Sequence, residues 1–220
     1  MKIISLILYS DDIPQYKQLM TLSQLYNEKM RQQYDYKYFY LQMKEDLSTD
    51  ILEDGHFLYV KGKECLIPGM YYKLVSAIRY LDTRYEYDRL LRTNISSFWN
   101  MYNFFELVHR LPPSGAAGIV VFNQFISGTG IIMSKDVANT LATYPNQNSL
   151  DDVLITGHLV KFTQISQVDD SQMPYLCDGY TENIPNHSNV LYYRIKNANR
   201  DDDVKLFKRL LKIVYDINVD

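Results

Sequence analysis

Apolar runs of strand length alternate along this chain with segments whose apolar residues recur at helical spacing. The first run, Met1 to Tyr9, is followed by Asp12 and Pro14, which are suited to cap and open a helix. Strand and helix patterns that alternate in this way favour an α/β fold with a largely parallel sheet flanked by helices. A length of 220 residues fits one such domain, so we expect residues 1–220 to form a single Rossmann-like domain.

The same patterns predict the remaining elements of the domain. Further strands are expected at Tyr36 to Met43, Phe57 to Val60, Tyr87 to Arg92, Ile119 to Phe122, Ile131 to Met133 and Leu191 to Ile195. Helices are expected around the apolar sets Leu19, Leu22, Tyr26 and Met30; Leu74, Ala77, Ile78 and Leu81; Phe98, Met101, Phe105 and Val108; Leu150, Val153, Leu154 and Gly157; and Val204, Phe207, Leu211 and Val214. The polar region from Gln167 to Asn189 is typical of a long functional loop.

Charge and composition exclude several classes of function. Lys and Arg total 23 against 26 for Asp and Glu, and a net charge of −3 provides no field that would collect nucleic acid or an anionic membrane. An anionic ligand must therefore be held by a local cluster of cations. No apolar stretch approaches the ~18 residues that span a bilayer, and the first strand has no cleavage pattern of a signal peptide. Two cysteines, Cys65 and Cys177, do not make a disulfide scaffold, so we expect a cytoplasmic protein without membrane insertion.

Two segments place small polar residues after apolar strands. In the first, Arg92-Thr93-Asn94-Ile95-Ser96, a strand ends in polar residues, and the carboxyl ends of parallel strands are where ligands bind. In the second, Ser127-Gly128-Thr129-Gly130, two glycines would let the backbone approach a ligand closely. An ordinary strand-to-helix turn and a tight turn are the simpler interpretations of each segment taken alone.

Two further segments carry charge. Asp151 and Asp152 are expected in the first turn of a helix, where the helix dipole stabilises carboxylates. One of them can also serve as a general base in a cleft. Arg194 and Lys196, with His187 a few residues earlier, form a local cationic group that could neutralise a phosphate. The structural alternative is a strand with alternate solvated cations.

The order of these segments resembles the GT-A glycosyltransferases of the β-1,3-glycosyltransferase type, the group that includes the β-1,3-galactosyltransferases and Fringe. In that family a helix carries a Lys, a strand ends in a Lys-Thr-Asp-Asp-Asp type motif, a Ser-Gly-Gly-Gly type segment runs into Leu-Ser-Arg-Asp, and Glu-Asp-Val follows. Here the corresponding residues are Lys73, Arg92 to Ser96, Ser127 to Asp136, and Asp151 to Val153. The resemblance covers roughly Pro68 to Leu159 in detail.

The resemblance implies a single GT-A domain that transfers a sugar from a nucleoside-diphosphate donor, a UDP-sugar, to an acceptor hydroxyl with inversion. It places the catalytic base within Asp151-Asp152, with Asp152 preferred because it directly precedes Val153. The absence of an anchor is unlike Golgi members of the family and suggests a bacterial or large-virus cytosolic enzyme, or one domain of a longer polypeptide. The donor-binding residues expected from the resemblance and from local charge are Tyr9, Ser10, Asp11, Lys73, Arg92, Thr93, Asn94, Ser96, Ser127, Gly128, Thr129, Gly130, Arg194 and Lys196.

One departure from the family puts its metal in doubt. Where the family carries the Asp-x-Asp that holds Mn²⁺ or Mg²⁺ on the donor diphosphate, this chain has Asn94-Ile95-Ser96. Hard cations prefer carboxylate oxygens, which Asn and Ser do not supply. Three outcomes are open: a metal-independent enzyme in which cations replace the metal, a weaker metal site using Asn94, Ser96 or His187, or a catalytically inactive module that binds nucleotide sugar or glycan. An unrelated α/β nucleotide-binding or structural protein is a further alternative.

Overall fold

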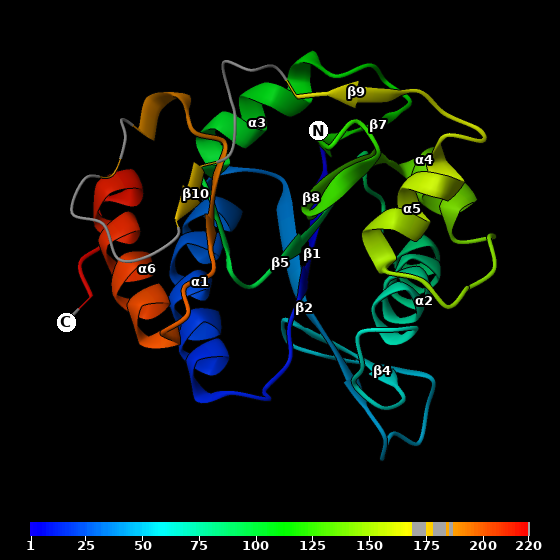
Figure 1. Cartoon of the computed structure of the whole chain (residues 1–220), viewed down its shortest axis with the longest axis horizontal. Coiled ribbons are helices and arrows are strands. Elements are labelled where there is room, and N and C mark those ends of the chain that lie inside the picture. The colour runs from blue at the N-terminus through cyan, green and yellow to red at the C-terminus, as the bar shows by residue number, and fades with distance from the viewer. Residues whose placement is uncertain (169–174, 178–183, 185–186, 220) are drawn as a thin grey trace. The chain divides into compact units, whose positions relative to one another are not determined.

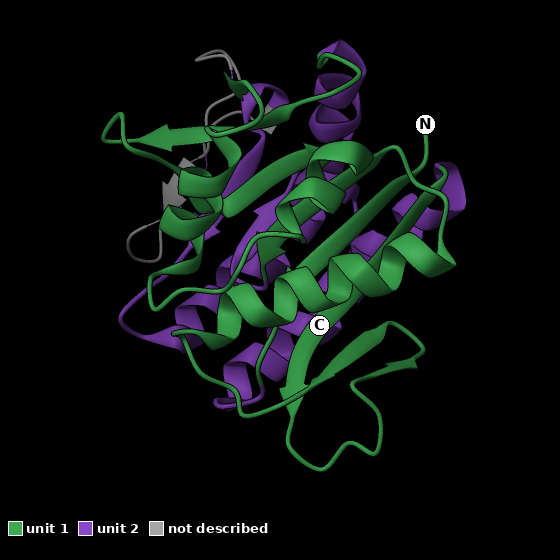
Figure 2. Ribbon diagram, turned by 90° about the vertical axis from the view of Figure 1, so that its right-hand side faces the viewer, with its two compact units in different colours: residues 1–10, 35–94, 111–167 green, residues 11–34, 95–110, 168–220 purple. Residues whose placement is uncertain are grey.

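The computed structural model describes residues 1–168, 175–177, 184 and 187–219 (Figure 1). Most of the loop expected from Gln167 to Asn189 lies outside these residues. Contacts between residues divide the chain into two compact units (Figure 2). Unit 1 comprises residues 1–10, 35–94 and 111–167, and unit 2 comprises residues 11–34, 95–110 and 168–220. The expectation of a single domain stays a prediction.

Unit 1 is built on an eight-stranded sheet with the strand order β3-β4-β2-β1-β5-β8-β7-β9. The strands are β1 (Ile3–Leu8), β2 (Tyr36–Lys44), β3 (Ile51–Asp54), β4 (Phe57–Lys61), β5 (Arg89–Asn94), β7 (Ala116–Val121), β8 (Phe125–Ser134) and β9 (Ile165–Gln167). Strand β1 runs parallel to β2 and β5, β2 is parallel to β4, and β7 is parallel to β9. Strands β3 and β8 pair antiparallel with their neighbours. The predicted α/β class with a mostly parallel central sheet is confirmed.

Three helices of unit 1 share a core with the sheet: α2 (Gly69–Arg84), α4 (Lys135–Leu141) and α5 (Asp151–Leu159). The predicted stripe of α2 is fully buried and packs in one cluster with alternate residues of β1 and β2 and with Leu90 of β5. Burying a large aliphatic side chain contributes about 1.5–3 kcal/mol, so this cluster is the main source of stability of unit 1. None of the helices in the described ranges is long and apolar enough to cross a bilayer.

Unit 2 combines helices α1 (Pro14–Gln33), α3 (Met101–Arg110) and α6 (Arg200–Tyr215) with a small sheet of order β10-β11-β6. Its strands are β6 (Ser97–Trp99), β10 (Tyr175–Cys177) and β11 (Tyr192–Ile195), and a 3₁₀ turn, η2, spans His187–Asn189. Aromatic rings hold α1 against α6: Tyr26 stacks on Tyr215 with 5.1 Å between ring centroids. The Tyr215 hydroxyl donates to the Trp99 carbonyl at 2.5 Å and accepts from the Met101 amide at 2.8 Å.

Several expectations for single elements were wrong. Phe98 lies in strand β6, and helix α3 begins only at Met101. Phe122 lies outside β7 with a positive φ of 53°, because the chain turns tightly there toward β8. Residues 127–130 are part of strand β8 and not a turn.

The beginnings of the helices also differ from the expectations. Ser149, whose side chain is of a type that often caps helices, does not cap α5, because the N-cap of α5 is Leu150. Asp12, which was expected to cap α1, does not do so, because the N-cap of α1 is Ile13. Leu150 and Val153 were expected in the core, but both are exposed because α5 turns Asp151 and Leu154 inward. The physical reason for this rotation is the ion pair of Asp151 described below.

His158 of α5 makes the stability of unit 1 depend on pH. The imidazole is 2% exposed and lies between the rings of Tyr71 and Tyr144, at centroid distances of 5.7 and 4.7 Å. Burial, and to a lesser degree the nearby Lys161, lowers the pKa of His158 below its usual value of 6.5. As the pH falls through this value, His158 is protonated in the unfolded chain but remains neutral in the folded chain. The free energy of unfolding therefore decreases as the pH drops.

We therefore expect the free energy of unfolding to decrease between about pH 7 and pH 5. His158→Phe, which keeps a ring between the two tyrosines, should remove part of this decrease, measured by urea denaturation across that range. The control is His109→Gln at the exposed end of α3, which should keep the wild-type pH dependence. An equal decrease in His158→Phe and in the wild type would contradict the assignment.

Candidate functional site

The candidate site of unit 1 lies where β1 and β5 end. Leu8 at the end of β1 pairs with Asn94 at the end of β5, and Thr93 pairs with Gly130 of β8 on the other side. The carboxyl ends of these parallel strands and the glycine segment of β8 therefore share one edge of the sheet, where α/β folds bind ligands. The predicted residues that unit 1 contributes to this region are Tyr9, Ser10, Lys73, Arg92, Thr93, Asn94, Ser127, Gly128, Thr129, Gly130, Asp151 and Asp152.

Arg92 is the centre of this region. Its side chain is only 3% exposed, and its Nη2 forms an ion pair with the Oδ2 of Asp151 in the first turn of α5. Its Nη1 donates to the Oδ1 of Asn94 at 3.2 Å. A buried guanidinium needs such partners because an uncompensated charge in the interior is strongly destabilising. Arg92 thus ties the end of β5 to the start of α5.

Gly128 packs directly against this ion pair. A Cβ atom at this position would lie 2.9 Å from Nη1 of Arg92 and 3.2 Å from Cβ of Asp152. The amide of Gly128 donates to Oδ2 of Asp152 at 3.4 Å. The glycine was expected to let a ligand approach, and the structure shows that it first allows β8 to approach Arg92 and Asp152.

The two carboxylates of α5 have different surroundings. Asp151 is 7% exposed and neutralised by Arg92. Asp152 is partly exposed, its Oδ1 accepts from the Val153 amide at 2.9 Å, and it has no ion pair within the described part of the chain. Its backbone is held in place because Thr156 donates to the Asp152 carbonyl at 2.8 Å and accepts from the Ile126 amide at 2.9 Å. Of the two, Asp152 therefore presents the carboxylate that no described cation neutralises.

Lys73 of α2 lies in a second ion pair. Its side chain is fully buried and pairs with Oε1 of Glu64, and its Nζ donates to the Tyr9 carbonyl at 3.3 Å. Burial is the main cause that lowers the pKa of Lys73, and Glu64 opposes this effect. The Oε2 of Glu64 accepts from the Met43 amide at 2.9 Å. The predicted phosphate cation therefore already has a carboxylate partner within unit 1.

Sequence reasoning did not find Glu64. The residue lies in the loop between β4 and α2 and belongs to no motif, so no sequence pattern indicated a functional role for it. The signal that could have found it is Lys73 itself, because a lysine on the apolar face of a helix requires an acidic partner.

Hydroxyl groups connect β5 and β8 beside this charged region. Thr93 donates to the Thr129 carbonyl at 2.7 Å, and the hydroxyls of Ser127 and Thr129 lie 2.8 Å apart. The Ser127 hydroxyl also accepts from the Thr129 amide at 3.4 Å, and Ser127 is partly exposed. The residues offer neutral hydrogen-bonding groups of the kind that a sugar needs.

The other predicted residues belong to unit 2: Asp11, Ser96, His187, Arg194 and Lys196. The Nη1 of Arg194 donates to the hydroxyl and, at 3.3 Å, to the carbonyl of Ser96. Burial lowers the pKa of Arg194. Asp11 and Lys196 are exposed, and His187 begins the η2 turn, where its side chain lies outside the described structure.

The residues at the position of the Asp-x-Asp do not fit a divalent cation. The Oδ1 of Asn94 accepts from Arg92, and the Oγ of Ser96 accepts from Arg194. Neither oxygen carries a charge, and each already accepts a hydrogen bond from a guanidinium. Over the described ranges of the chain, no three His, Cys, Asp or Glu side chains gather into a group that could hold a metal. Hard cations require a denser set of oxygen ligands than this.

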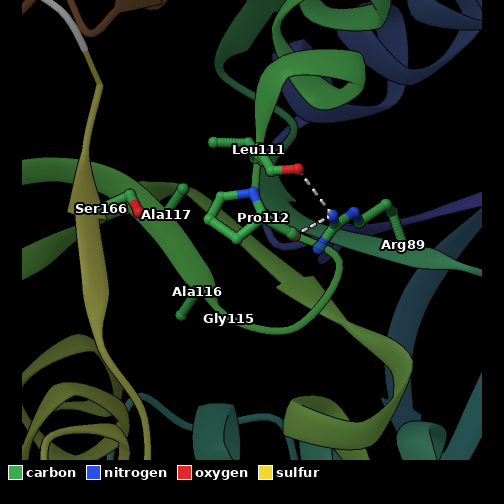
Figure 3. A pocket seen from close by; sticks show the side chains of 7 residues that line it. All are labelled: Arg89, Leu111, Pro112, Gly115, Ala116, Ala117 and Ser166. Carbon is green, nitrogen blue, oxygen red and sulfur yellow. Dashed lines mark hydrogen bonds between the residues drawn. The ribbon is translucent and has the colours of Figure 1, made fainter.

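A small cavity lies at the opposite end of β5, where the strand begins (Figure 3). Arg89 points toward it and donates to the carbonyls of Leu111, at 3.3 Å, and of Pro112. The cavity has room for about one water molecule. It is therefore too small for a sugar or a nucleotide.

Comparison with solved structures identifies the fold. A glycosyltransferase involved in glycosylation of the major capsid of PBCV-1 superposes with a TM-score of 0.58 and 11% identity, over 94% of this chain and 98% of that chain. The galactosyltransferase LgtC, solved with donor and acceptor sugar analogues, superposes with a TM-score of 0.54 and 8% identity, over 100% and 97% of the chains. An active-site mutant of LgtC gives a TM-score of 0.52 at 6% identity, over 94% and 95%.

This chain therefore shares the α/β fold of these glycosyltransferases. No family model matches the sequence, and no curated protein matches it. Because the identities lie between 6% and 11%, the shared property is the fold. The likeness to the Fringe group in particular stays a prediction.

The packing of Gly128 can be tested with a pair of glycine substitutions. Gly128→Ala should lower the free energy of unfolding by about 1–3 kcal/mol, because the new methyl group meets a guanidinium held by Asp151 and Asn94. Gly157→Ala in α5 is the control, since no atom beyond the chain neighbours and the backbone of α5 lies within 4 Å of its added Cβ. This control should raise stability by about 0.5–1 kcal/mol through helix propensity. Urea denaturation of both variants measures the difference, and equal stabilities would refute the close approach at Gly128.

Proposed function

We propose that this protein is a glycosyltransferase that moves a sugar from a nucleoside-diphosphate donor, a UDP-sugar, to an acceptor hydroxyl with inversion. The observation that carries the proposal is the carboxylate of Asp152, which no described cation neutralises and which lies beside the glycine segment at the edge where β1 and β5 end. The shared fold with glycosyltransferases, one of them solved with donor and acceptor sugar analogues, supports the same reaction class.

Asp152 is proposed as the general base. It takes the proton of the acceptor hydroxyl while that oxygen forms a bond to the anomeric carbon of the donor sugar. The bond from the anomeric carbon to the diphosphate oxygen breaks, and the nucleoside diphosphate leaves with the electron pair. Asp151 is poorly suited to this role because Arg92 already neutralises its carboxylate. This preference for Asp152 agrees with its place before Val153 in the family motif.

The departing diphosphate needs positive charge. Of the proposed phosphate cations, Lys73 and Arg92 each form an ion pair with a carboxylate. Arg194 forms no ion pair with a described residue and donates to the two oxygens of Ser96, so its charge is the less compensated. We propose Arg194, with the exposed Lys196 close to it in sequence, as contacts of the diphosphate. Tyr9, Ser10 and Asp11 are proposed for the nucleoside, and residues 127–130 for the sugar.

A protein that binds nucleotide sugar without catalysis is the second candidate, and the loss of both Asp-x-Asp carboxylates favours it. The two candidates differ in a direct experiment. Isothermal calorimetry with UDP- and GDP-sugars measures binding, and a donor panel with and without Mn²⁺ measures hydrolysis or transfer. Binding together with turnover supports the enzyme, whereas binding without turnover supports the second candidate.

The base assignment predicts a specific loss of rate. Asp152→Asn should lower kcat by about 10²–10⁴-fold, because the amide cannot take up the acceptor proton. The KM for the donor should change little. Asp136→Asn is the control, because Asp136 is also an acidic residue in the first turn of a helix of unit 1. The control should keep the wild-type rate, and a wild-type rate in Asp152→Asn would exclude Asp152 as the base.

A further inference from the structure

We propose that the guanidinium of Arg92 takes the structural place of a divalent cation, so that the site assembles and binds a nucleoside diphosphate without metal. The inference concerns the site of the proposed function and rests on it. In this role Arg92 is a positioning residue: it holds the strand end and the first turn of α5 in the arrangement that presents Asp152.

The first argument is the position of the charge. Arg92 lies between an oxygen of Asn94, which occupies the position of the first Asp of Asp-x-Asp, and a carboxylate oxygen of Asp151. A cation that joins a strand end to a nearby carboxylate would use oxygens of these kinds. The guanidinium already occupies both, with one terminal nitrogen on each.

The second argument is the lack of space for another ion. Gly128 packs so closely that even a methyl group at this position would lie 2.9 Å from Nη1 of Arg92. The guanidinium side chain is 3% exposed. A divalent cation could therefore reach the Asn94 and Asp151 oxygens only by displacing Arg92.

The third argument is electrostatic. Arg92 lowers the pKa of Lys73 and Asp151 raises it, so the three groups lie within electrostatic range of one another. Lys73 and Arg92 are balanced by Glu64 and Asp151, which makes the cluster neutral. The two carboxylates of the cluster are already paired with its own cations, so neither is left to compensate a divalent ion at this place; the carboxylate of Asp152 lies outside the cluster.

The first experiment uses the wild-type protein. Electron paramagnetic resonance of Mn²⁺ should show no binding to the protein in the absence of nucleotide. UDP should raise the unfolding temperature by the same amount in EDTA and in MnCl₂, because the diphosphate is held by the protein's own cations. Stoichiometric Mn²⁺ binding, or a UDP effect that requires Mn²⁺, would overturn the inference.

The second experiment restores a metal site. Arg92→Ala combined with Asn94→Asp removes the guanidinium and leaves two carboxylates, Asp151 and the new one, around the vacated space. Millimolar MnCl₂ should raise the unfolding temperature of this double variant by about 3 °C or more and leave the wild type unchanged. Arg92→Lys is the matched control: it keeps a cation in place and should show no Mn²⁺ effect.

The outcomes separate this inference from the proposed function. If UDP changes the unfolding temperature in neither buffer, the proposed donor binding fails, whereas the Mn²⁺ measurements still decide the role of Arg92. If the double variant folds and shows no Mn²⁺ effect, Arg92 does not occupy a cation site and the inference is wrong. If the double variant does not fold, the Mn²⁺ resonance of the wild type decides alone.

Discussion

The arrangement of the candidate site depends on the buried ion pair between Arg92 and Asp151. A charge in the interior is tolerated only when it is paired and hydrogen-bonded, and the two terminal nitrogens of the guanidinium meet this condition through Asp151 and Asn94. The pair fixes the orientation of α5, because Asp151 must face inward. Leu150 and Val153 then face outward despite their apolar side chains, and Asp152 is left at the edge of the sheet with a carboxylate that no described cation neutralises.

The buried ion pairs of unit 1 limit the positive charge that is available to a ligand. The two cations at the end of the sheet, Lys73 and Arg92, are both compensated by carboxylates. Their main effect is to hold the surrounding elements in place, because their ion pairs leave little net positive charge. A diphosphate ligand would therefore depend on other cations, and the proposed contact is Arg194, which donates to Ser96 and forms no ion pair with a described residue.

Much of the fold of unit 1 could be predicted from the amino-acid sequence. Strands β1, β2, β4 and β5 and helix α2 follow apolar patterns of period 2 or 3.6, or continuous apolar runs, which are local properties. The antiparallel edge strand β3 was not predicted, because its residues alternate only weakly and its pairing with β4 is what defines it. For Ser127 to Gly130 a tight turn was the simpler interpretation, because glycine is disfavoured in strands. The packing against Arg92 reverses that preference.

The sequence by itself determined the α/β class and the polar strand end at Arg92 to Asn94, and it singled out Asp151-Asp152 as a candidate pair, because these follow from local pattern and motif order. It also showed that the Asp-x-Asp carboxylates are absent. Only the tertiary structure decided which carboxylate is compensated and which is not, and that Glu64 partners Lys73. These are contacts between residues far apart in the chain, such as the 59 positions that separate Arg92 from Asp151. Burial sets the cost of each charge, and burial exists only once the chain has folded.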